Sequence, residues 1–169
     1  CFFVFFVLSR GREREMCIRE CFYIDGVISG SSKNLTKTGT GTVILRGTNT
    51  YSGTTTVSAG TLNIGGSGSL GSGTYAGNIS NSGTFTYASS TAQTLSGVIS
   101  GSGAITKSGS STLTLSGTNT YSGDTTISAG AIAVSGLLGN GTYAGAIANS
   151  GTLSLSSSSA QTLSGVISG

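Results

Sequence analysis

The sequence has no histidine, no proline and no tryptophan, and it has few charged residues. The absence of histidine excludes Ser-His-Asp and Cys-His catalytic arrangements, and it excludes histidine as a general acid or base. Charged residues make up 8% of the chain and are concentrated in the segment 1–25. A formal net charge of +3 without a cluster of Lys and Arg gives no basic patch, so we expect no nucleic-acid binding.

Carboxylates and thiols are equally scarce after residue 25, where Asp124 is the one acid and no cysteine occurs. A pair of catalytic carboxylates or an acidic metal site cannot be built from that part of the chain. Cys17 and Cys21 are close in sequence, but a zinc site needs about four ligands and no histidine is present to complete one. We therefore predict that the protein is not an enzyme and that it holds no cofactor and no metal.

What the sequence does contain is one long unit in two copies. Residues 47–60 read GTNTYSGTTTVSAG, and residues 117–130 repeat them with two changes, Thr54 to Asp124 and Val57 to Ile127. Residues 26–96 align with residues 97–164, and a third copy begins at Gly165, where Gly-Val-Ile-Ser-Gly occurs again. A long period of this kind is typical of stacked units that complete one another's core.

The segment 1–25 shares neither the composition nor the period of the copies. Residues 1–8 are apolar, but a helix that spans a membrane needs about 20 such residues. The charged residues that follow do not resemble the small-residue cleavage site of a signal peptide. We interpret residues 1–25 as a non-repeat leader, either the remnant of a signal segment or a misassigned start, and we predict that it does not join the repeat array.

Short segments with an apolar residue at every second position recur at equivalent places in both copies, and this pattern predicts half-buried strands. Ser, Thr and Gly are poor residues for helix interiors, so the expected fold is all-β. Because the unit repeats, we favour a parallel β-solenoid over an antiparallel sandwich, with about three turns in each copy of about 70 residues. Gly and Asn are expected to supply the positive φ angles of its corners. The alternating segments are residues 43–45, 62–64 and 85–87 in the first copy and 113–115, 132–134 and 153–155 in the second.

The order of motifs within each copy is more specific than the composition. From Leu35 to Leu62 the chain has a lysine followed by glycine, an apolar pair, Gly-Thr-Asn-Thr-Tyr-Ser-Gly and Ser-Ala-Gly, and residues 105–132 keep this order. The run resembles the autotransporter-associated β-strand repeat of bacterial passenger regions. The resemblance implies a right-handed parallel β-helix that is a non-catalytic stalk or adhesin-like fragment, located at the cell surface (outer membrane) or released. It also implies further copies downstream and a C-terminal barrel as the link to the membrane.

Four tyrosines at matching positions are the candidates for surface contact. Aromatic side chains repeated along one face can stack on glycans or contact host-surface or extracellular-matrix ligands. The competing interpretation is that each tyrosine covers the edge of a turn with its hydroxyl in water. The four candidates are Tyr51, Tyr121, Tyr75 and Tyr143.

Two other classes of protein remain as alternatives. Thr-x-Thr segments suggest an ice-binding or other secreted β-solenoid, but Thr84-Phe-Thr86 becomes Thr152-Leu-Ser154 in the second copy, which breaks the column of threonines. A disordered low-complexity segment rich in Ser, Gly and Thr is the second alternative. The recurring apolar pairs and a mean hydropathy of +0.22 count against disorder.

Overall fold

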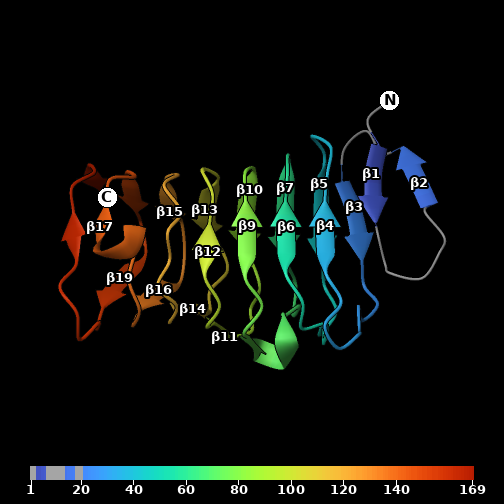
Figure 1. The fold of residues 1–169 in the computed structure, drawn as a ribbon, viewed down its shortest axis with the longest axis horizontal. Helices are drawn as coiled ribbons and strands as arrows, with labels where there is room; N and C mark the ends of the chain where they lie inside the picture. Colours follow the sequence, from blue (N-terminus) through green and yellow to red (C-terminus); the bar gives the residue numbers. More distant parts are fainter. Residues whose placement is uncertain (1–2, 7–13, 18–20) are drawn as a thin grey trace.

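The computed structural model describes residues 3–6, 14–17 and 21–169, with side chains described from Cys21 onward. Stacked turns of chain form a rod, with the two termini at opposite ends (Figure 1). Strands from successive turns pair in parallel, and the array has about seven turns. Two 3-10 turns, η1 (Gly71–Gly73) and η2 (Gly139–Gly141), are the helical elements of the described chain. The fold is therefore the predicted parallel β-solenoid, and the disordered alternative is wrong.

Three faces run along the rod because each turn contributes a short strand to each face in rotation. The first face is an eight-stranded sheet, the second a five-stranded sheet, and the third a four-stranded sheet. Beyond β12 (Ile99–Ser100), the third face continues through Thr120, whose N–H donates to Ile99 O (2.8 Å), toward a two-stranded sheet. In chain order, β10 (Thr84–Tyr87) lies on the first face, β11 (Gln93–Leu95) on the second, β12 on the third and β13 (Ala104–Lys107) again on the first.

The strands have the following bounds. The first face contains β3 (Cys21–Ile24), β5 (Thr42–Leu45), β7 (Thr61–Ile64), β10 (Thr84–Tyr87), β13 (Ala104–Lys107), β15 (Thr125–Ile127), β18 (Ile147–Asn149) and β21 (Ile167–Ser168). The second contains β8 (Thr74–Tyr75), β11 (Gln93–Leu95), β14 (Thr112–Leu115), β16 (Ala131–Val134) and β19 (Thr152–Leu155). The third contains β4 (Leu35–Lys37), β6 (Thr55–Val57), β9 (Ile79–Asn81) and β12 (Ile99–Ser100), followed by β17 (Thr142–Tyr143) and β20 (Thr162–Leu163).

Equivalent strands of the two copies lie on different faces. On the first face, a continuous series of parallel pairings leads from Cys21 to Ala104 in four turns. At this number of residues for each turn, one copy of about 70 residues makes about three and one-third turns and not the predicted three. For this reason β5 lies in the eight-stranded sheet and its equivalent β14 in the five-stranded sheet. Thr84 and Thr152 belong to different sheets and form no common column. Threonines do align on the first face, where Thr86 is opposite Thr106 and Thr106 is opposite Thr126.

The array begins earlier in the sequence than predicted. β3 pairs in parallel with β5, with Phe22 opposite Val43 and Ile24 opposite Leu45. The prediction that residues 1–25 stay outside the array is thus wrong for residues 21–24. Their alternating pattern is enough to form a strand although their composition differs from that of the copies. β1 (Phe3–Phe6) and β2 (Arg14–Cys17) form an antiparallel pair near β4 at this end of the rod (Figure 1).

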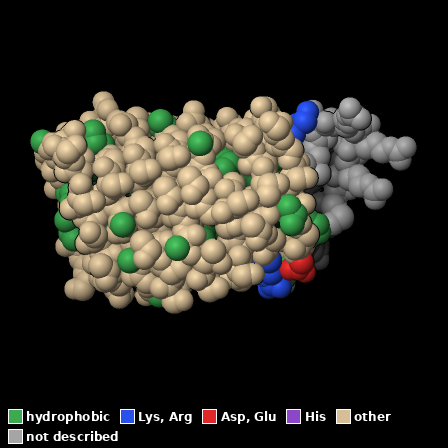
Figure 2. Space-filling model, turned by 90° about the horizontal axis from the view of Figure 1, so that it is seen from below, with side chains coloured by type: hydrophobic (Ala, Val, Ile, Leu, Met, Phe, Trp, Pro, Cys, Tyr) green, Lys and Arg blue, Asp and Glu red, His purple; other side chains and the backbone are tan. Residues whose placement is uncertain are grey.

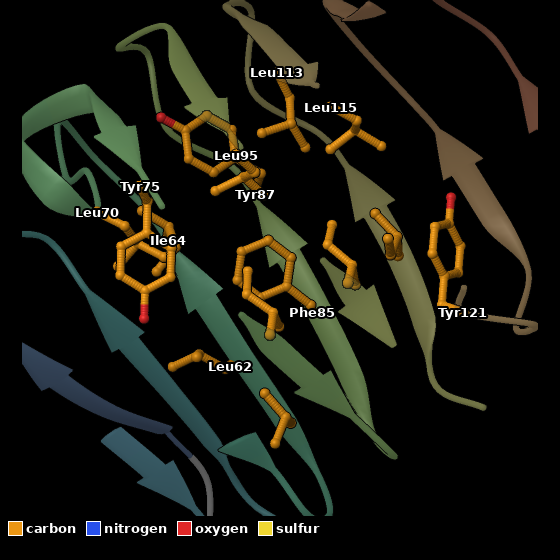
Figure 3. Close-up of a cluster of buried hydrophobic side chains, with 14 of the residues drawn as sticks. Leu62, Ile64, Leu70, Tyr75, Phe85, Tyr87, Leu95, Leu113, Leu115 and Tyr121 are labelled. Atoms are coloured by element: carbon orange, nitrogen blue, oxygen red, sulfur yellow. The ribbon is translucent and has the colours of Figure 1, made fainter. Parts of the chain in front are cut away.

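The core is a column of inward side chains, one layer for each turn. Phe85 is opposite Leu62 on one side and Ile105 on the other, and all three are fully buried. Figure 3 shows how leucine, phenylalanine and tyrosine side chains from neighbouring turns meet inside the rod. Leu113, which the alternating pattern places inward, is also fully buried. No turn could form such a core alone, since its apolar residues are covered by the turns on either side.

Glycine at the corners has two roles, of which the sequence suggested one. Gly60 and Gly130 have the expected positive φ, at 65° and 69°. Gly83 and Gly103 do not have positive φ, but a Cβ on Gly103 would overlap the carbonyl oxygen of Gly83 one turn away. Close approach of successive turns therefore explains these glycines. The column they belong to is Gly60, Gly83, Gly103, Gly123, Gly145 and Gly165.

Candidate functional site

The four tyrosines predicted to make surface contacts are core residues. Each has 1% or less of its side chain exposed, so none can stack on a glycan or meet a receptor. The prediction of a tyrosine contact surface is therefore wrong, and so is the interpretation that places their hydroxyls in water. The physical reason is that the hydroxyls find partners inside the rod, which allows the rings to be buried.

Two tyrosines and a threonine form a hydrogen-bonded chain in each copy. In the first copy Thr55 Oγ1 lies 2.8 Å from Tyr51 Oη and 2.7 Å from Tyr75 Oη. Tyr75 in turn donates to the carbonyl of Gly53. Because Tyr75 belongs to the turn after that of Tyr51, the chain links successive turns, and the two rings meet edge to face with centroids 5.5 Å apart.

The second copy repeats the arrangement. Thr125 Oγ1 lies 2.9 Å from Tyr121 Oη and 2.8 Å from Tyr143 Oη, and Tyr143 donates to the carbonyl of Gly123. Burial raises the pKa of all four tyrosines, since the phenolate would be desolvated. These hydroxyls therefore stay protonated at ordinary pH, where they act as structural donors and acceptors and not as acid or base catalysts.

Asparagine side chains connect three successive turns. Asn49 Oδ1 accepts the N–H of Ile28 (2.9 Å), and its Nδ2 donates to Gly47 O (2.8 Å) and to Ser69 O (3.1 Å) in the following turn. Asn119 makes the same set of bonds in the second copy. Each asparagine therefore satisfies backbone groups of its own turn and of the turns on either side.

Two buried lysines were not recognised from the sequence as core residues. Lys37 and Lys107 expose 1% or less of their side chains. Lys37 Nζ donates to Thr38 O (2.8 Å), Gly39 O (2.7 Å) and Ala59 O (3.1 Å), the last of which lies one turn further on. Burial lowers the pKa of both lysines. Their place on the inward side of alternating strands was the available signal, since β4 and β13 each end with an inward lysine.

A glutamine in each copy has a similar structural task. Gln93 Oε1 accepts the N–H of Leu70 (2.8 Å), and its Nε2 donates to Leu70 O (3.1 Å). Gln161 makes the equivalent pair of bonds to Leu138. Each glutamine thus holds in place the loop that leads into η1 or η2. That loop belongs to the solenoid turn before the one that contains the glutamine. The buried polar residues are therefore consistent with a scaffold whose turns are tied together.

The lateral surface carries hydroxyls and very little charge. Figure 2 shows one face with single scattered hydrophobic side chains, and its coloured charges lie near one end. There Arg46 Cζ lies 4.1 Å from the centroid of the Tyr23 ring, and Arg46 Nη1 lies 3.7 Å from a carboxylate oxygen of Asp25. This small cluster is solvent-exposed, so we assign it no more than a surface ion pair.

The described residues hold no group of three or more Cys, Asp or Glu placed to bind a metal ion. In the same part of the chain, no helix has the length and apolar character needed to cross a membrane. The buried side chains of the described residues stabilise the stacking of successive turns.

The class of protein defined by this fold is a parallel β-solenoid whose turns are held by apolar layers and by buried polar ties. Residues 35–64 and 105–134 each match the family model of the passenger-associated-transport-repeat, so the chain carries two such repeats. This match confirms the resemblance to an autotransporter passenger repeat. No curated protein and no solved structure matches the chain. Fold and repeats together are consistent with a fragment of an autotransporter passenger.

Proposed function

We propose that the chain is a non-catalytic, rod-forming part of a bacterial autotransporter passenger, located at the cell surface or released from it. The observation that carries this proposal is the coincidence of two passenger-associated transport repeats with one continuous solenoid. A rod of about seven turns, at about 4.8 Å for each turn, extends about 34 Å and so separates what it joins. In this role the chain is a structural spacer.

The second and more specific part of the proposal is an adhesin-like role. With the four tyrosines buried, contact with host-surface or extracellular-matrix ligands or with glycans falls to the outward Ser and Thr side chains. These side chains offer hydrogen bonds and almost no charge, which favours neutral polar partners over nucleic acid. No cofactor enters this proposal.

Replacing the passenger of an autotransporter of known surface exposure with this chain, carrying an epitope tag at its outer end, tests the location. We expect antibody to label the tag on intact cells and the chain to resist added protease. The control is Leu113→Asp, which places an unpaired charge in the core and should cost several kcal/mol of folding free energy. Retention of the unmodified chain inside the cell, or equal protease resistance of both forms, would count against the proposed role.

A further inference from the structure

The C-terminal end of the rod presents the strands that correspond to the last strands of the first copy (Figure 1). β19 and β20 each end a sheet, so one side of each strand has no paired strand among the described residues. Leu155 is 46% exposed there, whereas its equivalent in the first copy, Tyr87, is fully buried. Leu163 is partly buried, and its equivalent Leu95 is 1% exposed. An open strand edge with an uncovered apolar layer is a template for pairing with a further strand.

The first copy shows which segment covers such strands. β13 pairs in parallel with β10 and places Lys107 opposite Tyr87. β14 pairs in the same way with β11 and places Leu115 opposite Leu95. Residues 102–116, which contain β13 and β14, thus cover the end of the first copy as one continuous stretch. Because β19 and β20 are the equivalents of β10 and β11, a segment of this type fits them strand for strand.

The fit includes polar groups as well as apolar side chains. Asn81 is fully buried and donates from Nδ2 to Ala104 O (2.9 Å) in the covering segment. Its equivalent in the second copy, Asn149, is only partly buried. Lys107 brings a partner for its own charge, because its Nζ donates to Gly109 O within the covering segment. A lysine can therefore enter this contact without leaving a buried charge unpaired.

We infer that the C-terminal end of the rod is a strand-accepting surface for a further passenger-associated-transport-repeat. The incoming repeat pairs in parallel through a segment of the type of residues 102–116. Its apolar residue before Thr-Lys covers Leu153, and its lysine covers Leu155. Continuity with the contact between the two copies carries the inference, since equivalent strands meet the same kind of segment in the same register. The inference rests on the proposed rod for the identity of the repeat, and it adds the register and the buried lysine of the contact.

A lengthened chain tests the contact. Residues 102–116 are appended directly after Gly169, which is the equivalent of Gly101. We expect a higher midpoint of thermal unfolding than for the original chain, because the appended turn covers Leu155. The matched control carries Ile105→Asp in the appended segment alone and should show no rise, because it places a charge in the contact. Equal midpoints for the two lengthened chains would overturn the inference.

Cysteine pairs in the lengthened chain test the register. Thr106 is opposite Thr86, and Ser154 is the equivalent of Thr86. Cysteines at Ser154 and at the appended copy of Thr106 should form a disulfide, because opposite Cα atoms of neighbouring strands lie about 4.8 Å apart. Ser156→Cys in place of Ser154→Cys is the control, with Cα atoms about 8 Å apart and beyond the reach of a disulfide. Equal disulfide formation by the two pairs would contradict the assigned register.

The cysteine variants also carry Cys1→Ser, Cys17→Ser and Cys21→Ser, so that only the introduced thiols react. Sedimentation of the original chain tests a second copy of the whole rod as the occupant. We expect a monomer, because the end of another rod does not carry the segment that fits β19 and β20. A dimer that Leu155→Asp dissociates would assign the surface to a second rod and overturn the inference. These readouts use purified protein, so they can fail while the proposed location stands.

Discussion

At the residue scale, the polar side chains that join successive turns of this protein are the buried ones. The Thr125 hydroxyl is hydrogen-bonded to the hydroxyls of both Tyr121 and Tyr143, so one side chain joins two successive turns. The sequence suggested surface tyrosines because tyrosine is amphipathic and recurs with the copy. Tyr75 and Tyr143 are instead satisfied by groups of the preceding turn, which the linear order of residues does not bring together.

Removing that hydroxyl provides a direct test. Thr125→Val keeps the shape of a buried side chain but leaves two tyrosine hydroxyls short of a partner. We expect a loss of about 1–3 kcal/mol in the free energy of unfolding, measured by urea titration followed by circular dichroism. Thr126→Val, on the outward side of the same strand, is the control and should change stability by no more than about 0.5 kcal/mol. Equal effects of the two variants would refute the role of the hydroxyl.

Alkaline pH tests the same burial without mutation. Burial raises the pKa of the four tyrosines, and also that of Tyr87, above the ordinary value of 10.0. Above that value the unfolded chain binds fewer protons than the folded chain, so stability is retained below about pH 10 and is lost as pH rises further. The lowered pKa of the buried lysines acts in the opposite sense only up to about their ordinary value of 10.5.

We therefore expect phenolate absorbance from these tyrosines to appear together with the loss of the β signal in circular dichroism. The measurement is a joint absorbance and circular dichroism titration. Complete ionisation of the tyrosines in a chain that still gives the native spectrum would show that they are not buried.

At the scale of the element, the corner is as informative as the strand. Glycine columns allow the backbone of one turn to approach the next closely, as Gly103 does over Gly83. The strands themselves are only two to four residues long, so much of each turn consists of corners. Errors in a corner should therefore be as costly as errors in the core.

Gly103→Ala tests the cost of a change at a corner. The φ of Gly103 is not positive, so the penalty would come from overlap of the new methyl group with the carbonyl of Gly83. We expect a loss of about 1–3 kcal/mol, seen as a lower thermal midpoint. Gly26→Ala is the matched control, because nothing lies within 4 Å of a Cβ at that position. A midpoint lowered equally by both changes would point to backbone entropy or another general effect.

At the scale of the whole molecule, stability is a sum over neighbouring turns, so the ends of the array have particular weight. β3 covers β5 with Phe22 and Ile24, although these residues lie in the segment first interpreted as a leader. The array as described thus includes a strand that carries no repeat motif.

Truncation at two positions measures what β3 contributes. Deleting residues 1–24 should lower the thermal midpoint relative to deleting residues 1–20, because Val43 and Leu45 lose their partners on one side. Both truncated forms are compared with the full chain by calorimetry. Identical midpoints for the two truncations would show that β3 adds nothing to the array.

The sequence by itself determined the fold class, because strict alternation puts Leu113 and Leu115 on the same side of a strand whatever surrounds it. It also determined the repeat family, since the order of motifs is a local property of each copy. Only the tertiary structure decided that Lys37 and Tyr75 are inside, because stacking brings their polar atoms to partners in a neighbouring turn, the carbonyl of Ala59 and the hydroxyl of Thr55. The tertiary structure alone decided that equivalent strands of the two copies face directions about a third of a turn apart. That angle depends on how many residues each turn uses, and the turn is set by packing on its neighbours rather than by the length of the repeat.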